Sequence, residues 1–151
     1  MTFKILVPVD LAEESSYQQP LAVAFEQAQK LGGEVTVLTV VPDIMAGLDW
    51  RYAIRGEKGG AGDLDMKAIV RDAEQRLEQI VAAAVPPGIT IDTIARHGVI
   101  YEVILELAAE LQVDQIIMAA HRPTLGRFLL GEITARVVRH AKCSVNVVRN
   151  G

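Results

Sequence analysis

Three side chains that could bind a negatively charged ligand follow one another closely in the second half of the chain. They are His121, Arg122 and Arg127, and they stand between an apolar run at 116–120 and Gly131, where a helix is expected to begin. The N-terminus of a helix presents unpaired N–H groups and the positive end of the backbone dipole, so phosphate groups bind there readily. The segment therefore predicts an anion site at the junction of a strand and a helix.

Each of these side chains also has a simpler interpretation. Arg122 and Arg127 could donate charge-assisted hydrogen bonds to phosphate oxygens, or they could be solvated surface charges. His121 could donate to phosphate, could titrate near pH ~6.5, or could only occupy a turn. The residues alone leave these alternatives open.

Glu132 works against an anion, because it stands in the first turn of the same predicted helix. A carboxylate there can satisfy the unpaired N–H groups itself, and it repels phosphate. Two like charges about 4 Å apart cost about 4 kcal/mol at an effective dielectric constant of about 20. Glu132 must therefore turn away, or be bridged to the phosphate by magnesium or an arginine, or the site is weakened.

Catalysis and metal binding find little support in the sequence. The three histidines are too widely spaced to predict a metal site: His97, His121 and His140. Cys143 is expected to be a small buried apolar residue and not a nucleophile. A slow ATPase, or another hydrolase that uses Ser15 or Ser16 with His121, is a third-ranked hypothesis, because nothing indicates that a nucleophile, a base and an orienting acid converge. We expect no catalytic residue.

The elements that must position these residues alternate between strand and helix. Short apolar runs predict strands, and apolar residues spaced three or four apart predict helices. Strands are expected at 3–9, 35–41, 89–95, 115–119 and 143–148. Helices are expected at 21–31, 66–84, 100–111 and 132–140. This order predicts an α/β fold, a doubly wound five-stranded parallel sheet with helices on both faces, Rossmann-like in type.

Two strand ends are expected to be neighbours at the edge where such sheets bind ligands. Pro8, Val9 and Asp10 end the first strand, and Met118 and Ala119 end the fourth. The segment 42–62 is rich in glycine and lacks a period, which predicts a long flexible loop within a single domain spanning 1–151.

The overall composition argues against some classes of partner. The formal net charge of the 151 residues is -4, whereas surfaces that bind nucleic acid or anionic membranes are rich in Lys and Arg. A basic, apolar leader segment is not apparent, and no run of about 20 apolar residues occurs. We therefore expect a cytoplasmic protein with no nucleic-acid or membrane partner.

Two segments of the chain resemble the universal stress protein family. The first reads ILVPVD at 5–10; the second reads LLG at 129–131 and RHAKCSVNVVR at 139–149. The resemblance covers nearly the whole chain. It implies a five-stranded parallel sheet and a homodimer formed through the last strand, from Cys143 to Val148. As in many members, it also implies ATP or another adenine nucleotide, with or without Mg²⁺, at the first and fourth strands.

The resemblance also implies roles for individual residues. Asp10 would accept hydrogen bonds from ribose hydroxyls, or it would only start a turn, and Val40 would offer backbone groups to the adenine. The implied nucleotide site comprises Pro8, Val9, Asp10, Val40, Met118, Ala119, His121, Arg122, Pro123, Arg127, Gly131, Glu132 and Ile133.

The chain departs from the family's nucleotide signature, which is Gly, two residues, Gly, nine residues, then Gly-Ser or Gly-Thr. Ala119 and Arg122 occupy the first two glycine positions. Only eight residues, 123–130, separate Arg122 from Gly131, and Glu132 replaces the hydroxyl residue. A subgroup of the family is similar in carrying Ala or Ser before His-Arg-Pro with the shorter spacing, and its members can hold ATP.

The last predicted strand lacks proline and internal charge, so its open edge favours pairing with a second copy. The leading hypothesis is a dimeric, adenine-nucleotide-binding regulator of the stress response with an unidentified protein partner, not a metabolic enzyme. The alternative is a nucleotide-free homodimeric interaction module of the same fold, which Arg122, the shortened spacing and Glu132 favour.

Overall fold

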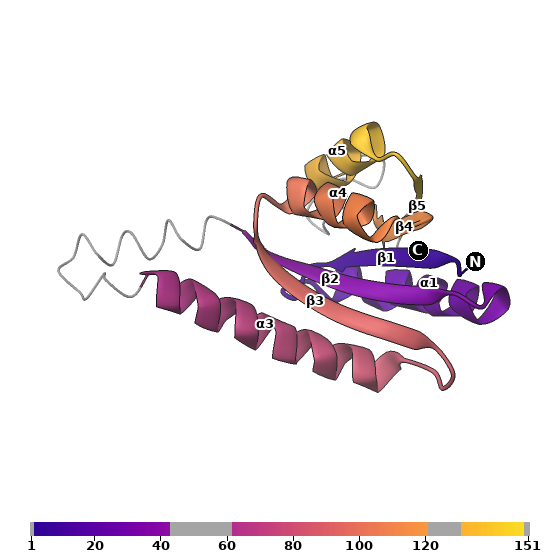
Figure 1. The fold of residues 1–151 in the computed structure, drawn as a ribbon, viewed down its shortest axis with the longest axis horizontal. Helices are drawn as coiled ribbons and strands as arrows, with labels where there is room; N and C mark the ends of the chain where they lie inside the picture. Colours follow the sequence, from indigo (N-terminus) through magenta and orange to yellow (C-terminus); the bar gives the residue numbers. More distant parts are fainter. Residues whose placement is uncertain (1, 43–61, 121–130, 150–151) are drawn as a thin grey trace.

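A computed structural model describes residues 2–42, 62–120 and 131–149 of the chain. Within these ranges, five parallel strands form one sheet, and helices cover both faces (Figure 1). The strands are β1 (Lys4–Val9), β2 (Glu34–Pro42), β3 (Thr90–Gly98), β4 (Gln115–Ala119) and β5 (Ser144–Val148). The helices are the 3-10 turn η1 (Glu14–Ser16), α1 (Gln18–Leu31), α3 (Gly62–Ala84), α4 (Ile100–Leu111) and α5 (Glu132–His140). The predicted α/β fold is confirmed.

The order of the strands, β3-β2-β1-β4-β5, places the reversal of the sheet between β1 and β4. The chain first builds outward from β1 through β2 to β3, and then returns to the other side of β1. Ile5 pairs with Gln115 and Leu6 with Ile116, so β1 and β4 run side by side in the same direction. The ends of these two strands are therefore neighbours, as predicted.

The sheet is buried on both faces, which explains why β1 reads as a continuous apolar run and not as an alternating one. Successive side chains point to opposite faces. Ile5 and Val7 pack against α1 and α3, whereas Leu6 packs against α4 and α5. In Figure 1 the two helices of each pair lie on the same side of the sheet. Two separate cores result, one on each face.

Three glycines set how closely helix and strand follow each other. Gly32 ends α1 in the left-handed conformation with φ 67°, and a Cβ on Gly33 would lie 2.7 Å from the carbonyl oxygen of Phe3. Gly98 has φ 146°, and a Cβ there would lie 2.9 Å from Cγ2 of Val103. Because Gly98 permits this approach, α4 begins two residues after β3 ends, directly beside the carboxyl edge of the sheet.

The elements differ from the sequence prediction mainly at their ends. β2 and β3 pair along nine residues each, from Glu34 with Thr90 to Pro42 with Gly98, and are longer than predicted. A 3-10 turn precedes α1 in a stretch that the sequence indicated only as a polar lead-in. Pro42 belongs to β2 and Gly62 to α3, and the rest of the predicted loop lies outside the described residues. No helix in the described ranges combines the length and apolarity needed to cross a membrane.

Candidate functional site

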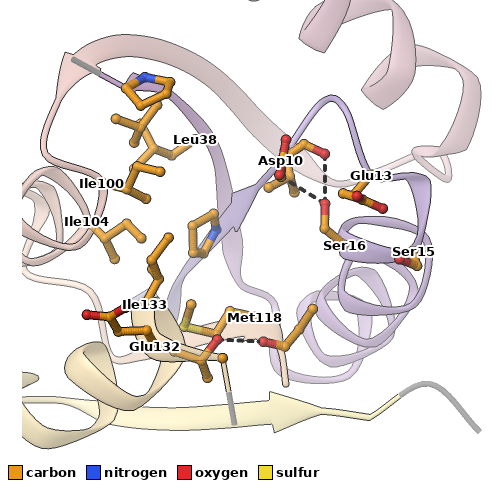
Figure 2. A pocket seen from close by; sticks show the side chains of 17 residues that line it. Asp10, Glu13, Ser15, Ser16, Leu38, Ile100, Ile104, Met118, Glu132 and Ile133 are labelled. Carbon is orange, nitrogen blue, oxygen red and sulfur yellow. Dashed lines mark hydrogen bonds between the residues drawn. The ribbon is translucent and has the colours of Figure 1, made fainter. Parts of the chain in front are cut away.

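A pocket of about 530 Å³ opens at the carboxyl ends of β1, β2 and β4 (Figure 2). Its walls come from three strands, from the turn after β1 and from the first turns of α4 and α5. Ligands of doubly wound sheets bind at this edge, where the strand order reverses, and the volume falls in the range of small-molecule sites. The lining residues are Pro8, Val9, Asp10, Glu13, Ser15, Ser16, Leu38, Val40, Pro42, Ile100, Ile104, Met118, Ala119, Gly131, Glu132, Ile133 and Thr134.

One wall of the pocket is apolar. Leu38 and Val40 are alternate residues of β2 and so share a face of the sheet, while Ile100 and Ile104 stand one turn apart on α4. Figure 2 shows Leu38, Ile100 and Ile104 gathered on the same side of the pocket. A flat, weakly polar ring would contact this wall without loss of hydrogen bonds, so the wall suits a nucleobase or a similar heterocycle.

The opposite wall is a polar turn organised by Asp10 and Ser16. The Ser16 hydroxyl donates to the carbonyl oxygen of Asp10 at 2.8 Å and accepts from its backbone N–H at 2.9 Å. The Oδ1 atom of Asp10 accepts from the backbone N–H of Ala12 at 3.0 Å, as expected of an aspartate that starts a turn. The Asp10 residue is nevertheless exposed at the pocket, so the turn and a ligand contact are compatible.

Two buried threonines hold the floor of the pocket together. Thr39 Oγ1 donates to the carbonyl oxygen of Val9 at 3.2 Å, and Thr134 Oγ1 donates to the carbonyl oxygen of Ala119 at 2.9 Å. The two acceptors are the last residues of β1 and β4. Backbone carbonyls shielded from bulk solvent need hydrogen-bond donors, and the two hydroxyls supply them at these strand ends. Thr39 is 4% exposed and Thr134 is 5% exposed. Their hydroxyls thus fix the two strand ends on which the pocket is built.

The N-terminus of α5 lies at the edge of the pocket without a side-chain cap. Gly131, the residue that precedes the helix, donates its N–H to Ala120 at 2.9 Å, which ties the helix start to the end of β4. Gly131, Glu132 and Ile133 all line the pocket. The first turn therefore presents backbone N–H groups and the positive end of the helix dipole to this side of the protein.

Glu132 turns its carboxylate along the helix. Its Oε1 atom accepts from Nη2 of Arg136 at 2.9 Å, and the guanidinium of Arg136 lies 4.9 Å from the centre of the Tyr101 ring. The carboxylate therefore does not cap its own helix. The sequence left open whether Glu132 faces a ligand or turns away. In the structure, its carboxylate points along α5 to Arg136.

Nine of the residues implied by the sequence line the pocket together: Pro8, Val9, Asp10, Val40, Met118, Ala119, Gly131, Glu132 and Ile133. The other four lie outside the described residues: His121, Arg122, Pro123 and Arg127. Sequence reasoning did not assign the following to a nucleotide site: Glu13, Ser15, Ser16, Leu38, Pro42, Ile100, Ile104 and Thr134. The two-residue period of β2 relates Leu38 to Val40 and could have indicated it, whereas α4 gave no signal of its proximity.

The described lining residues carry three carboxylates, on Asp10, Glu13 and Glu132, and neither lysine nor arginine. Carboxylates accept hydrogen bonds from hydroxyl and amino groups and repel anions. Among the described residues, no group of three or more His, Cys, Asp or Glu side chains is placed to hold a metal ion. The described carboxylates therefore suit a ligand group that donates hydrogen bonds, such as a hydroxyl.

The hydrolase hypothesis names Ser15 or Ser16 as nucleophile and His121 as base. The Ser16 hydroxyl is engaged with Asp10, and His121, the base in that hypothesis, lies outside the described residues. The slow hydrolase therefore stays a hypothesis.

Comparison with known proteins places these features in a family. The sequence model of the universal stress protein family matches residues 1–149. Universal stress protein G of Salmonella typhimurium is 28% identical over 145 residues, which cover 96% of this chain and 97% of the relative. The structure of the universal stress protein UspA from Lactobacillus plantarum is similar with a TM-score of 0.65 and 27% identity, covering 97% of each chain. A universal stress protein in complex with cAMP has the same fold, with a TM-score of 0.60 and 21% identity over 98% of this chain and 97% of its own.

Proposed function

Because the chain belongs to the universal stress protein family, we propose that it is a stress-response regulator whose pocket binds an adenine nucleotide or nucleoside. The observation that carries the proposal is the pocket itself. Its apolar wall on β2 and α4 stands opposite the exposed carboxylate of Asp10, at the reversal of the sheet. An adenine would contact the apolar wall while the ribose hydroxyls donate to Asp10.

The comparison structures support the class of ligand. One protein with this fold is in complex with cAMP, an adenine nucleotide. In the present chain, Val40 on the apolar wall is the residue whose backbone would meet the adenine edge, and Asp10 is the residue that would meet the sugar. The ligand would act by changing the surface that meets a protein partner.

We further propose that the protein works in the cytoplasm as a homodimer formed through β5. This strand pairs with β4 on one side, and no other described strand lies on its second side. An unpaired edge exposes backbone N–H and C=O groups, and a second copy of the strand would satisfy them. Two-fold pairing of β5 would leave the pocket accessible on each subunit.

Isothermal titration of the purified full chain with adenosine, AMP and ATP tests the proposal, with and without magnesium. We expect saturable binding of at least one adenine ligand below the millimolar range, and weaker binding of the matching uridine compound. The matched variant Val40→Phe places a larger side chain on the apolar wall and should abolish the signal. Absence of saturation with every adenine ligand up to millimolar concentration would remove this function.

A nucleotide-free interaction module is the second candidate, and the three carboxylates that line the pocket favour it. The same titration separates the two, because the module would be dimeric in solution and bind no adenine ligand. A slow ATPase remains third, tested by phosphate release with Asp10→Ala as the control.

A further inference from the structure

Glu132 combines two properties that bear on the length of the ligand's phosphate tail. It lines the pocket, and it is the first residue of α5, whose N-terminus would otherwise attract an anion. A negative charge at this point repels any ligand group that carries phosphate.

The carboxylate is held in place by its neighbours. Arg136, one turn further along α5, donates to Glu132 at 2.9 Å, and its guanidinium stacks on the Tyr101 ring of α4 at 4.9 Å. The arginine thus contacts both the ring and the glutamate. In this arrangement the charge of Glu132 lies on the first turn of α5, beside Arg136 and open to solvent.

The ion pair between Glu132 and Arg136 contributes little to the stability of the protein. The two side chains are 80% and 45% exposed, and exposed pairs four residues apart on a helix stabilise it by only about 0.3–0.5 kcal/mol. The charge of Glu132 matters more for the binding of a charged ligand, because each phosphate added to the ligand brings more negative charge near this carboxylate. Asp10 and Glu13 on the opposite wall add to the repulsion.

We propose that Glu132 is a specificity-determining residue that makes the pocket select adenine ligands with a short phosphate tail or none over ATP. The inference rests on the proposed function, since it concerns which adenine ligand the same pocket takes. Among the described residues, a nucleoside would meet the apolar wall and Asp10, a monophosphate would bring one phosphate to the start of α5, and a triphosphate would bring a longer tail beside Glu132.

The experiment compares adenosine, AMP and ATP, without magnesium, on the wild-type chain and on Glu132→Gln. Glutamine keeps the shape and can still accept from Arg136, so only the charge is removed. We expect the wild type to bind AMP or adenosine more tightly than ATP. In the variant, the affinity for ATP should rise about tenfold, for AMP about threefold, and for adenosine by less than about twofold, with smaller differences at high salt.

A matched control comes from α1, where Glu26 pairs with Lys30 at 2.8 Å with the same four-residue spacing. Glu26→Gln removes one charge and one exposed helical ion pair away from the pocket, and should leave all three affinities unchanged. A second variant, Arg136→Met, removes the cation that partly neutralises Glu132. It should weaken ATP by about threefold while adenosine is unaffected.

The outcomes separate this inference from the proposed function. If the wild type binds ATP more tightly than AMP and Glu132→Gln leaves their ratio unchanged, Glu132 does not select, although the pocket binds adenine ligands. If neither protein binds any of the three ligands, the proposed function falls and this inference falls with it. If ATP binds only after Glu132→Gln, the selective role of Glu132 is upheld and ATP is excluded as the natural ligand.

Discussion

The hydroxyl of Thr134 donates a 2.9 Å hydrogen bond to the carbonyl oxygen of Ala119, and this bond joins the first turn of α5 to the last residue of β4. The backbone bond from Gly131 to Ala120, also 2.9 Å long, runs beside it. Together they set where the helix start lies relative to the sheet. The pocket therefore depends on a contact that spans the poorly patterned segment of the sequence between β4 and α5.

Thr134→Val should destabilise the protein, because valine has nearly the same shape but removes the hydroxyl that donates to the partly buried carbonyl of Ala119. We expect the free energy of unfolding to fall by about 0.5–1.5 kcal/mol, the net contribution of one such hydrogen bond. Urea denaturation followed by circular dichroism measures it. Thr90→Val, at an exposed position of β3, is the control, and equal effects of both changes would contradict the role given to the bond.

Asp10→Asn separates the turn from the ligand contact. Asparagine can still accept from the N–H of Ala12, so the turn should survive, but it loses the charge that strengthens a bond from a ribose hydroxyl. We expect the wild type to bind adenosine about tenfold more tightly than 2′,3′-dideoxyadenosine, and this ratio to shrink to about threefold or less in the variant. Titration calorimetry of both ligands gives the ratios. The same ratio in both proteins would mean that Asp10 only shapes the turn.

Val147→Pro tests the proposed dimer. The carbonyl oxygen of Val148 accepts from Ala120 within the sheet, so the backbone groups of Val147, one residue earlier, point to the open side of β5. Proline there removes an outward N–H while leaving the pairing with β4 in place. We expect a dimeric wild type and a folded, monomeric variant by native mass spectrometry. A wild type that is monomeric at micromolar concentration would rule out this interface.

The contribution of Cys143 to stability should decrease at alkaline pH. Partial burial raises the pKa of the Cys143 thiol, with a further increase from Asp114, against hydrogen bonds from the backbone of Cys143 and Ile116 that lower it. In the unfolded chain a thiol ionises at about pH 8.5, while the folded chain retains its proton. The contribution is therefore fully present below that pH and is lost as the pH rises through the folded pKa.

Comparison of the wild type with Cys143→Ala isolates this effect from other groups that titrate in the same range. The difference between their unfolding free energies, from urea titrations at pH values between about 7 and 10, should shift in favour of the alanine variant as the pH rises. A difference that is constant over the whole range would show that the thiol is equally hydrated in both states.

Much of the fold follows from local pattern. α4 and α5 have the predicted bounds, with Gly98 ending β3 shortly before α4 and Gly131 directly preceding α5. β4 also has its predicted bounds. β2 also includes residues 34 and 42, and β3 also includes 96–98. These ends could not be predicted, because they form strand only by pairing with each other.

The sequence predicted where the candidate site lies in the fold, but not all of the residues that line it. The rule for doubly wound sheets indicated that Asp10 and Met118 would lie at one edge, and both line the pocket. Ile104 joins the same wall from a helix 60 or so residues beyond β2 in the chain, and its spacing on α4 indicates only that it is buried. Which buried face meets which strand depends on packing.

The sequence by itself determined the class of fold, the order of its elements and the two strand ends that meet, because apolar periodicity and glycine positions are properties of short segments. Only the tertiary structure decided what surrounds a ligand: the Ser16 bonds that shape the turn at Asp10, the threonines beneath the floor, and the direction of Glu132. A side chain chooses its direction from the partners within its reach. For Glu132 those partners are Arg136 and, behind it, Tyr101 from another helix, which no local pattern brings together.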